Sequence, residues 1–346
     1  MERKERYNVA VVGATGAVGQ KMIQTLEDRN FPVEILKPLA SARSVGQFVS
    51  FHGQQIAVEE ATPEAFEGID FALFSAGGSV SLRLAPEAAK RGAIVIDNTS
   101  AFRMDPNVPL VVPEVNAEAI AAHNGIIANP NCSTIQMVVA LKPIYDAFGI
   151  DKIVVSTYQA VSGAGQKAID ELEQQVRGYA TGELLQANVL PVSSLPVHHQ
   201  IAFNAIPQID VFEENGYTKE EMKMVNETKK IFNDPTIQVT PTAVRIPVVF
   251  GHSESVFVKT KRPFTMDAVR ELLEQGEGIV VVDDPASQKY PLATEAAGKR
   301  EVFVGRLRKD LWDENAFNMW VVSDNVLKGA AWNAVQIAET IISDLA

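Results

Sequence analysis

Cysteine is nearly absent from this chain of 346 residues, and Cys132 is the single one. One cysteine cannot form an internal disulfide, so the chain does not read as a disulfide-stabilised secreted domain, and the cytoplasm is the expected location. Runs of eighteen apolar residues are also absent, and the charged start Met1–Arg6 is not followed by an apolar segment. The sequence therefore predicts neither a membrane span nor a signal peptide.

Positive charge is in deficit, because 31 Lys and Arg residues stand against 43 Asp and Glu residues, for a formal net charge of −12. This balance argues against general nucleic-acid binding, and an anionic ligand would have to be held by a few locally placed basic side chains. No spacing of His, Cys and acidic residues completes a metal-binding set. We therefore expect no metal, no nucleic acid and no membrane among the partners.

A glycine-rich turn lies close to the start of the chain. The apolar stretch Tyr7–Val12 runs into Gly13–Gly19, and a helical pattern follows. Gly13 allows a tight turn, Gly16 lets backbone amides approach a pyrophosphate, and Gly19 lets the helix pack closely on the strand. The order strand, glycine turn, helix predicts a dinucleotide-binding site, with a merely structural turn as the alternative.

Apolar strands and helical stretches alternate over the first 130 residues. The expected strands after the first are Val33–Ala40, Phe71–Phe74, Ala93–Ile96 and Leu110–Val112. This alternation predicts an α/β fold with a doubly wound parallel sheet, the Rossmann-like arrangement.

Arg43 and Ser44 follow the second expected strand. An NAD-preferring site would usually carry an acidic residue there for the ribose 2′-hydroxyl. A basic residue flanked by serines suits a 2′-phosphate instead, so the sequence favours NADP. The alternative is an arginine in a solvated loop.

The single cysteine stands in Ala128–Thr134, where a short apolar strand gives way to a helical pattern. A thiol in the first turn of a helix lies against unpaired amides and the positive end of the helix dipole, which favours the thiolate. A lone cysteine is otherwise a small buried hydrophobic residue. The residues of this segment alone leave both interpretations open.

Several charged residues stand in unusual places. Arg103 follows a strand end and could bind a phosphate or carboxylate, whereas a surface ion pair is the common alternative. Arg245 interrupts an apolar run and needs an anionic partner. His252 suits proton transfer near neutrality, although a histidine in a turn is usually structural. Glu220 and Lys223 are one turn apart on an expected helix and form a surface ion pair by default.

A second domain of the α+β class is expected beyond residue 130. The alternating strand Lys152–Gln159 ends in the turn Ala160–Gly165, and later apolar stretches indicate a sheet with helices such as Met266–Gln275. Thr218 is expected to cap the helix that carries Glu220.

The last amphipathic pattern, Val326–Leu345, predicts one helix that returns to the first domain. We therefore expect a dinucleotide-binding domain of residues 1–130, completed by residues 326–346, and a catalytic domain of residues 131–325. A dinucleotide fold combined with a cysteine at a helix start, a histidine and several arginines suggests thiol-based oxidation or reduction of an acyl or aldehyde group.

Seven segments, in order along essentially the whole chain, together resemble the bacterial type of aspartate-semialdehyde dehydrogenase. They are Gly13–Gly19, Asn98–Arg103, Asn129–Thr134, Tyr158–Gly165, Glu220–Lys223, Arg245–Val248 and Gly251–Ser253. The resemblance implies a reversible, NADP-dependent reductive dephosphorylation of aspartyl 4-phosphate to aspartate 4-semialdehyde. Inorganic phosphate is then a co-substrate, and the pathway leads to diaminopimelate and lysine, methionine, threonine and isoleucine.

The resemblance also implies roles for individual residues. Cys132 would be the nucleophile that carries the thioester, His252 the acid/base, and Gln159 the residue that orients the thioester. Arg245 would hold the substrate carboxylate, Glu220 the substrate amino group, and Arg103 with Lys223 the phosphate. The cofactor site would comprise Gly13, Thr15, Gly16, Ala17, Val18, Arg43, Ser44, Ser162, Gly163 and Asn325. A homodimer, or a tetramer, would form through the second domain.

Three alternatives stay open at this stage. One is an N-acetyl-γ-glutamyl-phosphate reductase, although Arg245 and Glu220 together suit a free amino acid better than an acetylated one. Another is a cysteine hydrolase or acyltransferase that uses Cys132 and His252 without redox chemistry, against which the glycine turn and Arg43 argue. The third is a non-catalytic NADP-binding regulator.

Overall fold

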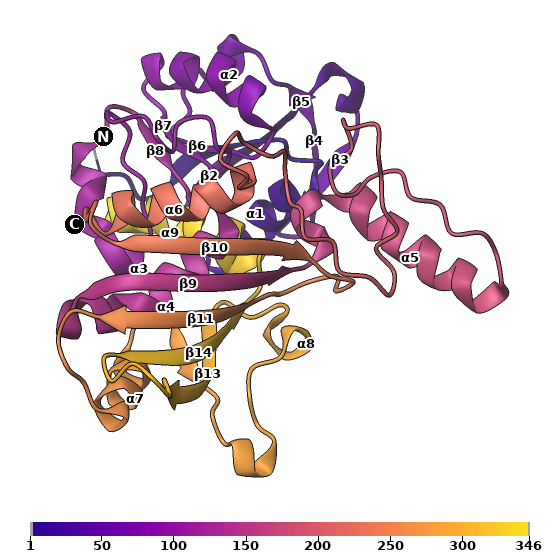
Figure 1. Ribbon diagram of the computed structural model, residues 1–346. Coiled ribbons are helices and arrows are strands. Elements are labelled where there is room, and N and C mark those ends of the chain that lie inside the picture. The colour runs from indigo at the N-terminus through magenta and orange to yellow at the C-terminus, as the bar shows by residue number, and fades with distance from the viewer. Residues whose placement is uncertain (1–2, 345–346) are drawn as a thin grey trace. The chain divides into compact units, whose positions relative to one another are not determined.

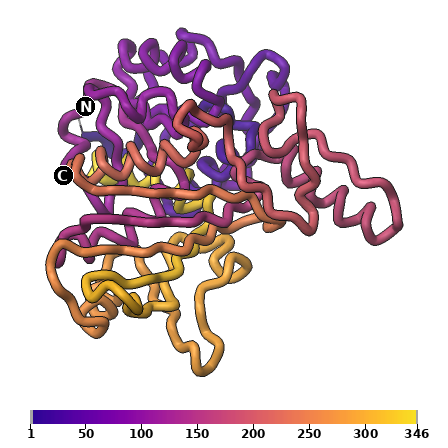
Figure 2. The backbone as a smooth tube through the Cα atoms, viewed as in Figure 1, coloured from indigo at the N-terminus to yellow at the C-terminus, as the bar shows by residue number. Residues whose placement is uncertain are grey.

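The protein, a computed structural model that describes residues 3–344, forms two compact units (Figures 1 and 2). Unit 1 comprises Met1–Asn131 and Gly329–Ala346, and unit 2 comprises Cys132–Lys328. The chain therefore leaves unit 1 immediately before its only cysteine and returns to it for the last segment.

Unit 1 is built on a six-stranded parallel sheet in the order β5-β2-β1-β6-β7-β8. The strand order reverses direction between β1 and β6, and the carboxyl edge at such a reversal is where ligands of these sheets bind. The expected class of fold for this half of the chain is confirmed. The strands are β1 (Tyr7–Val12), β2 (Val33–Ala40), β5 (Glu59–Glu60), β6 (Phe71–Phe74), β7 (Ile94–Asp97) and β8 (Ile126–Ala128), with a separate hairpin of β3 (Phe48–Phe51) and β4 (Gln54–Ala57).

The helices of unit 1 include the last helix of the chain. That helix packs against the first and contributes Val335, Ile337 and Ile341 to the same buried cluster as Val9 and Val11. The core of the unit is thus assembled from both ends of the sequence. The helices are α1 (Ala17–Asp28), α2 (Gly78–Lys90), α3 (Pro113–Asn116) and α9 (Trp332–Asp344).

Two expected elements of unit 1 are different in the structure. Leu110–Val112 is not a strand, because Leu110 makes only an isolated bridge to Ala128. The amide of Val112 bonds to the side chain of Asn116 at 2.9 Å, and Pro113 begins α3, so the ladder cannot continue. The expected single helix Val326–Leu345 is also divided, because a π-helical segment, Leu327–Ala331, precedes α9. Leu345 lies outside the described residues.

Unit 2 is built on a six-stranded mixed sheet in the order β10-β9-β11-β14-β13-β12. The edge pairs are parallel and the central pairs antiparallel. Helix α4 packs against α6 and α7, and the three helices cover one face of this sheet. The elements are β9 (Ile150–Gln159), β10 (Gln238–Arg245), β11 (His252–Thr260), β12 (Ile279–Val281), β13 (Val302–Lys309) and β14 (Ala316–Ser323), with α4 (Cys132–Phe148), α5 (Gln166–Thr181), α6 (Lys219–Ile231), α7 (Met266–Gln275) and α8 (Ala293–Ala296).

The expected cap of α6 is confirmed. The amide of Glu221 donates to the Thr218 hydroxyl at 3.3 Å, and the amide of Thr218 donates to the Glu221 carboxylate at 2.7 Å. This capping box satisfies two amide groups at the helix start and fixes the direction of the first turn, which carries Glu220.

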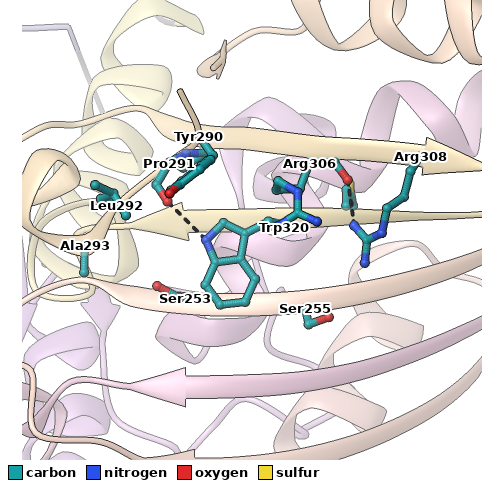
Figure 3. Close-up of a pocket in the computed structure, with 10 residues that line it drawn as sticks. Ser253, Ser255, Tyr290, Pro291, Leu292, Ala293, Arg306, Arg308 and Trp320 are labelled. Atoms are coloured by element: carbon teal, nitrogen blue, oxygen red, sulfur yellow. Dashed lines mark hydrogen bonds between the residues drawn. The ribbon is translucent and has the colours of Figure 1, made fainter. Parts of the chain in front are cut away.

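The opposite face of the unit 2 sheet carries a pocket of about 370 Å³ (Figure 3). Trp320 of β14 lies opposite Ser255 of β11 in the ladder, and its indole donates to the Pro291 carbonyl at 3.1 Å. Arg306 and Arg308 of β13 also line the pocket, which is therefore positively charged. Within residues 3–344, no helix is both long enough and apolar enough to cross a membrane.

Candidate active site

Two of the predicted site residues occupy equivalent positions at the ends of neighbouring strands in unit 2. Gln159 and Arg245 lie directly opposite each other as the last residues of the parallel strands β9 and β10. His252 begins β11, on the other side of β9. The sheet therefore brings three residues together that are far apart in the sequence.

The backbone of Ala160 links two of these side chains. Its amide donates to His252 Nδ1 at 3.0 Å, and its carbonyl accepts from Arg245 Nη1 at 2.7 Å. Because Nδ1 accepts this hydrogen bond, the neutral imidazole carries its proton on Nε2. Sequence reasoning missed Ala160, since its contribution comes from backbone atoms that any residue would have.

Gln159 is held by groups on two sides. Its Oε1 accepts from the Thr157 hydroxyl at 3.0 Å, and its Nε2 donates to Glu220 Oε1 at 3.1 Å. Glu220 Oε2 in turn lies 3.0 Å from Lys223 Nζ, which also contacts Asp210 at 3.2 Å. Glu220 and Lys223 therefore join the predicted site as well as forming an ion pair. Thr157 was missed, although strand alternation places residues 157 and 159 on one face.

Burial and charge keep His252 neutral. Its pKa is lowered to about 3, first by burial and then by the nearby positive charge of Arg245, while Glu220 acts in the opposite direction. Burial likewise lowers the pKa of Arg245, whereas Glu220 and Cys132 raise it. The last effect shows that Cys132 lies within electrostatic reach of the Arg245 guanidinium.

Cys132 is the first residue of α4 and is partly exposed. The start of a helix and a nearby guanidinium both favour the thiolate form of a cysteine. If Cys132 were only a small buried hydrophobic residue, it would need neither the helix start nor the nearby guanidinium. The geometry of unit 2 therefore supports the nucleophile interpretation.

Gly163 and Ser162 lie beside this cluster. A Cβ atom on Gly163 would lie 2.9 Å from Arg245 Nη1 and 3.3 Å from His252 Nε2, so the backbone here closely covers both side chains. The Ser162 hydroxyl and the Asn325 Nδ2 atom are 3.0 Å apart, and Asn325 Oδ1 accepts from the Gly251 amide at 3.0 Å. The three residues predicted for the cofactor in this half of the chain are thus tied to the loop before His252.

The glycine turn of unit 1 fits a pyrophosphate. Gly13 has a φ of +88°, and a Cβ on Gly19 would lie 2.1 Å from the Gly13 carbonyl, so both positions require glycine. α1 has no acidic residue in its first turn and no side-chain cap at Gly16, which leaves its amino-terminal amides for an anion. Thr15 and Ser44 place their hydroxyl oxygens 3.5 Å apart, with Arg43 exposed beside them.

Arg103 is fixed within unit 1. It is 7% exposed and donates to the carbonyls of Asn129 at 2.9 Å and Asn98 at 2.8 Å. The Asn129 side chain donates to Asn98 at 2.7 Å and accepts from Asn333 at 2.6 Å. This network holds Arg103 beside the turn that leads to Cys132.

The predicted site residues thus form two groups. Arg103, Gly13–Val18, Arg43 and Ser44 belong to unit 1, and the others belong to unit 2. Within residues 3–344, no group of three His, Cys, Asp or Glu side chains is placed to bind a metal ion.

Comparison with known proteins gives the family. Residues 8–123 match the semialdehyde dehydrogenase NAD binding domain, and residues 141–328 match the semialdehyde dehydrogenase dimerisation domain. The chain is 61% identical over 335 residues to the aspartate-semialdehyde dehydrogenase of Bacillus subtilis, an alignment that covers 96% of this chain and 97% of that protein. The chain belongs to the aspartate-semialdehyde dehydrogenase family.

Solved structures of the aspartate-semialdehyde dehydrogenase family have the same fold. Aspartate-semialdehyde dehydrogenase II of Vibrio cholerae, in complex with ASA, superposes with a TM-score of 0.94 at 52% identity over 99% of both chains. The Candida albicans enzyme with NADP superposes with a TM-score of 0.75 at 27% identity, covering 99% of this chain and 100% of that one. The resemblance seen in the sequence is confirmed, and the chain is an NAD(P)-dependent dehydrogenase with a dimerisation domain.

Proposed function

We propose that the chain catalyses the reversible, NADP-dependent reductive dephosphorylation of aspartyl 4-phosphate to aspartate 4-semialdehyde through a thioester on Cys132. The reaction supplies the biosynthesis of lysine, methionine, threonine and isoleucine. The observation that carries the proposal is the buried guanidinium of Arg245, whose Nε has no hydrogen-bond acceptor in residues 3–344. A substrate carboxylate would satisfy this atom and account for the cost of burying the charge.

The other contacts of the substrate follow from the charges around Arg245. Glu220 places a buried negative charge beside Gln159, where it would bind the amino group of a free amino acid. Lys223 and Arg103 would bind the phosphate group, Lys223 from unit 2 and Arg103 from unit 1. A substrate with an acetylated amino group offers Glu220 no positive charge, which favours the aspartyl substrate over the N-acetylglutamyl one.

The chemistry begins at the Cys132 thiolate. The sulfur attacks the carbonyl carbon of the acyl phosphate, a carbon–sulfur bond forms, the carbon–oxygen bond to phosphorus breaks, and inorganic phosphate leaves. NADPH, when bound, supplies the hydride that reduces the thioester carbon. The carbon–sulfur bond then breaks, which releases the aldehyde and restores the thiolate.

His252 would act on the oxygen of the tetrahedral intermediates. Its Nε2 holds a proton while Nδ1 is fixed by the Ala160 amide, so Nε2 can donate a hydrogen bond to an oxyanion and exchange the proton with it. Gln159, held by Thr157 and Glu220, would orient the thioester carbonyl.

The cofactor would bind to both groups of predicted residues. In unit 1 the glycine turn Gly13–Val18 would hold the pyrophosphate, and Arg43 with Ser44 would bind the 2′-phosphate that distinguishes NADP from NAD. In unit 2 Ser162, Gly163 and Asn325 would lie against the nicotinamide half. Residues 1–131 with 329–346 then serve as the NADP-binding domain and residues 132–328 as the catalytic and dimerisation domain.

We also propose that two copies of the chain associate through the sheet face shown in Figure 3. This face lies in the matched dimerisation domain, and helices cover the opposite face. Its Trp320 and Tyr158 rings lie 5.5 Å apart, an aromatic pair typical of an interface core. A reduced, reactive cysteine as nucleophile supports a location in the cytoplasm.

The deciding experiment measures NADPH formation from aspartate semialdehyde with and without inorganic phosphate, for the native chain and for Cys132→Ala. We expect turnover that depends on phosphate and is lost in the variant, at equal thermal stability of the two proteins. Turnover with N-acetylglutamate semialdehyde instead would transfer the assignment to that substrate. NADP binding without turnover on either aldehyde would favour a non-catalytic regulator.

A further inference from the structure

Asp210 is an acidic residue of unit 2 that the chemistry above does not use. Its Oδ2 lies 3.2 Å from Lys223 Nζ, and its Oδ1 accepts from the Val211 amide at 2.8 Å. Lys223 Nζ also lies 3.0 Å from Glu220 Oε2. Two carboxylates thus share one ammonium group, and the three side chains together carry a charge of −1.

The segment that carries Asp210 is fixed at both ends by elements of the candidate site. Ile206 exchanges two backbone hydrogen bonds, each of 2.9 Å, with Arg245 at the end of β10. The Val211 carbonyl accepts at 2.9 Å from the amide of Lys219, the first residue of α6. Asp210 has a φ of +69°, a left-handed conformation that Gly, Asn and Asp adopt more readily than other residues. The fold therefore places this carboxylate, which is more than a chance contact of a surface lysine.

The second carboxylate changes what the ion pair of Glu220 and Lys223 can attract. Alone, these two side chains would largely cancel each other's charge. The proposed function needs Glu220 to attract the amino group of the substrate, and its Oε1 lies beside Gln159 with the side chain only 7% exposed. Asp210 offsets the charge of Lys223, so Glu220 keeps its attraction for a cation.

We propose that Asp210 is a specificity-determining residue, whose negative charge makes the site favour a substrate with a free, positively charged amino group. The same charge weakens the binding of phosphate, because it reduces the attraction of Lys223 for an anion. Asp210 thus balances the binding of an ammonium group against that of phosphate. The inference rests on the proposed function, because it uses the roles given there to Glu220 and Lys223.

The test is Asp210→Asn, which removes the charge and keeps an oxygen that can accept from the Val211 amide. Asparagine also tolerates the left-handed backbone, so the variant should fold as the native chain does. We expect KM for aspartate semialdehyde to rise about threefold to tenfold and KM for phosphate to fall about twofold or more, with kcat within about twofold of the native value. A general distortion of the site would raise both KM values. A rise in both, or a change in neither, would overturn the proposal.

Two further variants separate the charge of Asp210 from other effects. Asp210→Gly also fits the positive φ but removes the whole side chain, so it should shift both KM values in the same directions as Asp210→Asn. Asp146→Asn is the matched control, because Asp146 Oδ1 lies 2.8 Å from Lys142 Nζ near the carboxyl end of α4. The control should change neither KM. Shifts of opposite sign in the two Asp210 variants would contradict a role through charge.

A binding measurement needs no turnover and separates this inference from the proposed reaction. The native protein and Asp210→Asn are titrated in a calorimeter with L-aspartate and with N-acetyl-L-aspartate. The native protein should bind L-aspartate more tightly. The substitution should weaken the binding of L-aspartate about threefold or more and should not weaken that of N-acetyl-L-aspartate, because acetylation removes the positive charge.

The outcomes of the titration are distinct. Equal weakening of both ligands, or a native protein without preference for the free amino group, would overturn the inference. A native protein that shows the expected pattern but does not turn over aspartate semialdehyde would support the inference and refute the proposed reaction.

Discussion

At the scale of single residues, the imidazole of His252 is the group most altered by its surroundings. The Ala160 amide fixes its tautomer, and burial and Arg245 keep it neutral near pH 7. A neutral ring beside Arg245 adds no second positive charge to the cluster. The guanidinium of Arg245 would therefore stay available for the substrate carboxylate proposed above.

This environment predicts a dependence of stability on pH. The pKa of His252 is about 3 in the folded protein and about 6.5 in the unfolded chain, so between these values the unfolded chain binds more protons. Stability contributed by His252 is present above pH 6.5 and is lost as pH falls, by about 2 kcal/mol at pH 5. The free energy of urea unfolding should fall between pH 7 and pH 5 in both proteins. The fall should be about 2 kcal/mol smaller in His252→Gln than in the native protein. Substitution of the exposed His52 by Gln is the control, and equal losses in the His252 variant and the native protein would refute the prediction.

Candidate residues were predictable where the side chain itself would perform the chemistry. Cys132 at a helix start, Arg245 in an apolar run and His252 after a glycine each leave a local pattern in the sequence. Ala160 leaves none, because it contacts His252 and Arg245 through its backbone. Its place in the cluster depends on the strand register, which only the folded sheet supplies.

At the scale of elements, hydrophobic periodicity located most of the helices and strands. The expected bounds of Val33–Ala40 and Met266–Gln275 agree with the structure, and the helix ends at Gly276 as a breaker residue predicts. The strand expected at Leu110–Val112 was wrong, since the Asn116 side chain takes the Val112 amide. The hairpin of β3 and β4 was missed, because its strands are short and partly exposed.

The close approach of α1 to the glycine turn yields a prediction at this scale. In Gly19→Ala the new methyl group would lie 2.1 Å from the Gly13 carbonyl, so α1 must move away from the turn. We expect a loss of about 1–3 kcal/mol in stability and an at least tenfold weaker binding of NADP, measured by urea unfolding and by fluorescence titration. Gly78→Ala, at the start of α2 with no atom within 4 Å of the added carbon, should leave the stability unchanged. Unaltered NADP affinity in Gly19→Ala would show that the helix start does not hold the pyrophosphate.

At the scale of the whole molecule, the proposed dimer can be tested through the face in Figure 3. Ser255 lies on that face opposite Trp320 and beside a pocket that already carries Arg306 and Arg308. In Ser255→Arg a third positive charge and added bulk should shift the mass in sedimentation equilibrium toward the monomer value of 37.6 kDa. Ser50→Arg, at an exposed position of β3 outside the dimerisation domain, should remain a dimer. An intact dimer in the Ser255 variant would place the interface elsewhere.

The completion of unit 1 by Gly329–Ala346 has a consequence for how the protein matures on the ribosome. Residues of α9 such as Ile337 and Ala338 fill the core beside β1, so the first unit lacks part of its interior until α9 (Trp332–Asp344) has been translated. The second unit, by contrast, is complete in sequence once Lys328 has been added. Because domains fold as units during synthesis, unit 1, although its translation begins first, can be completed only after unit 2 has been translated. A nascent chain that stops early would carry the nucleophile but no finished nucleotide-binding half.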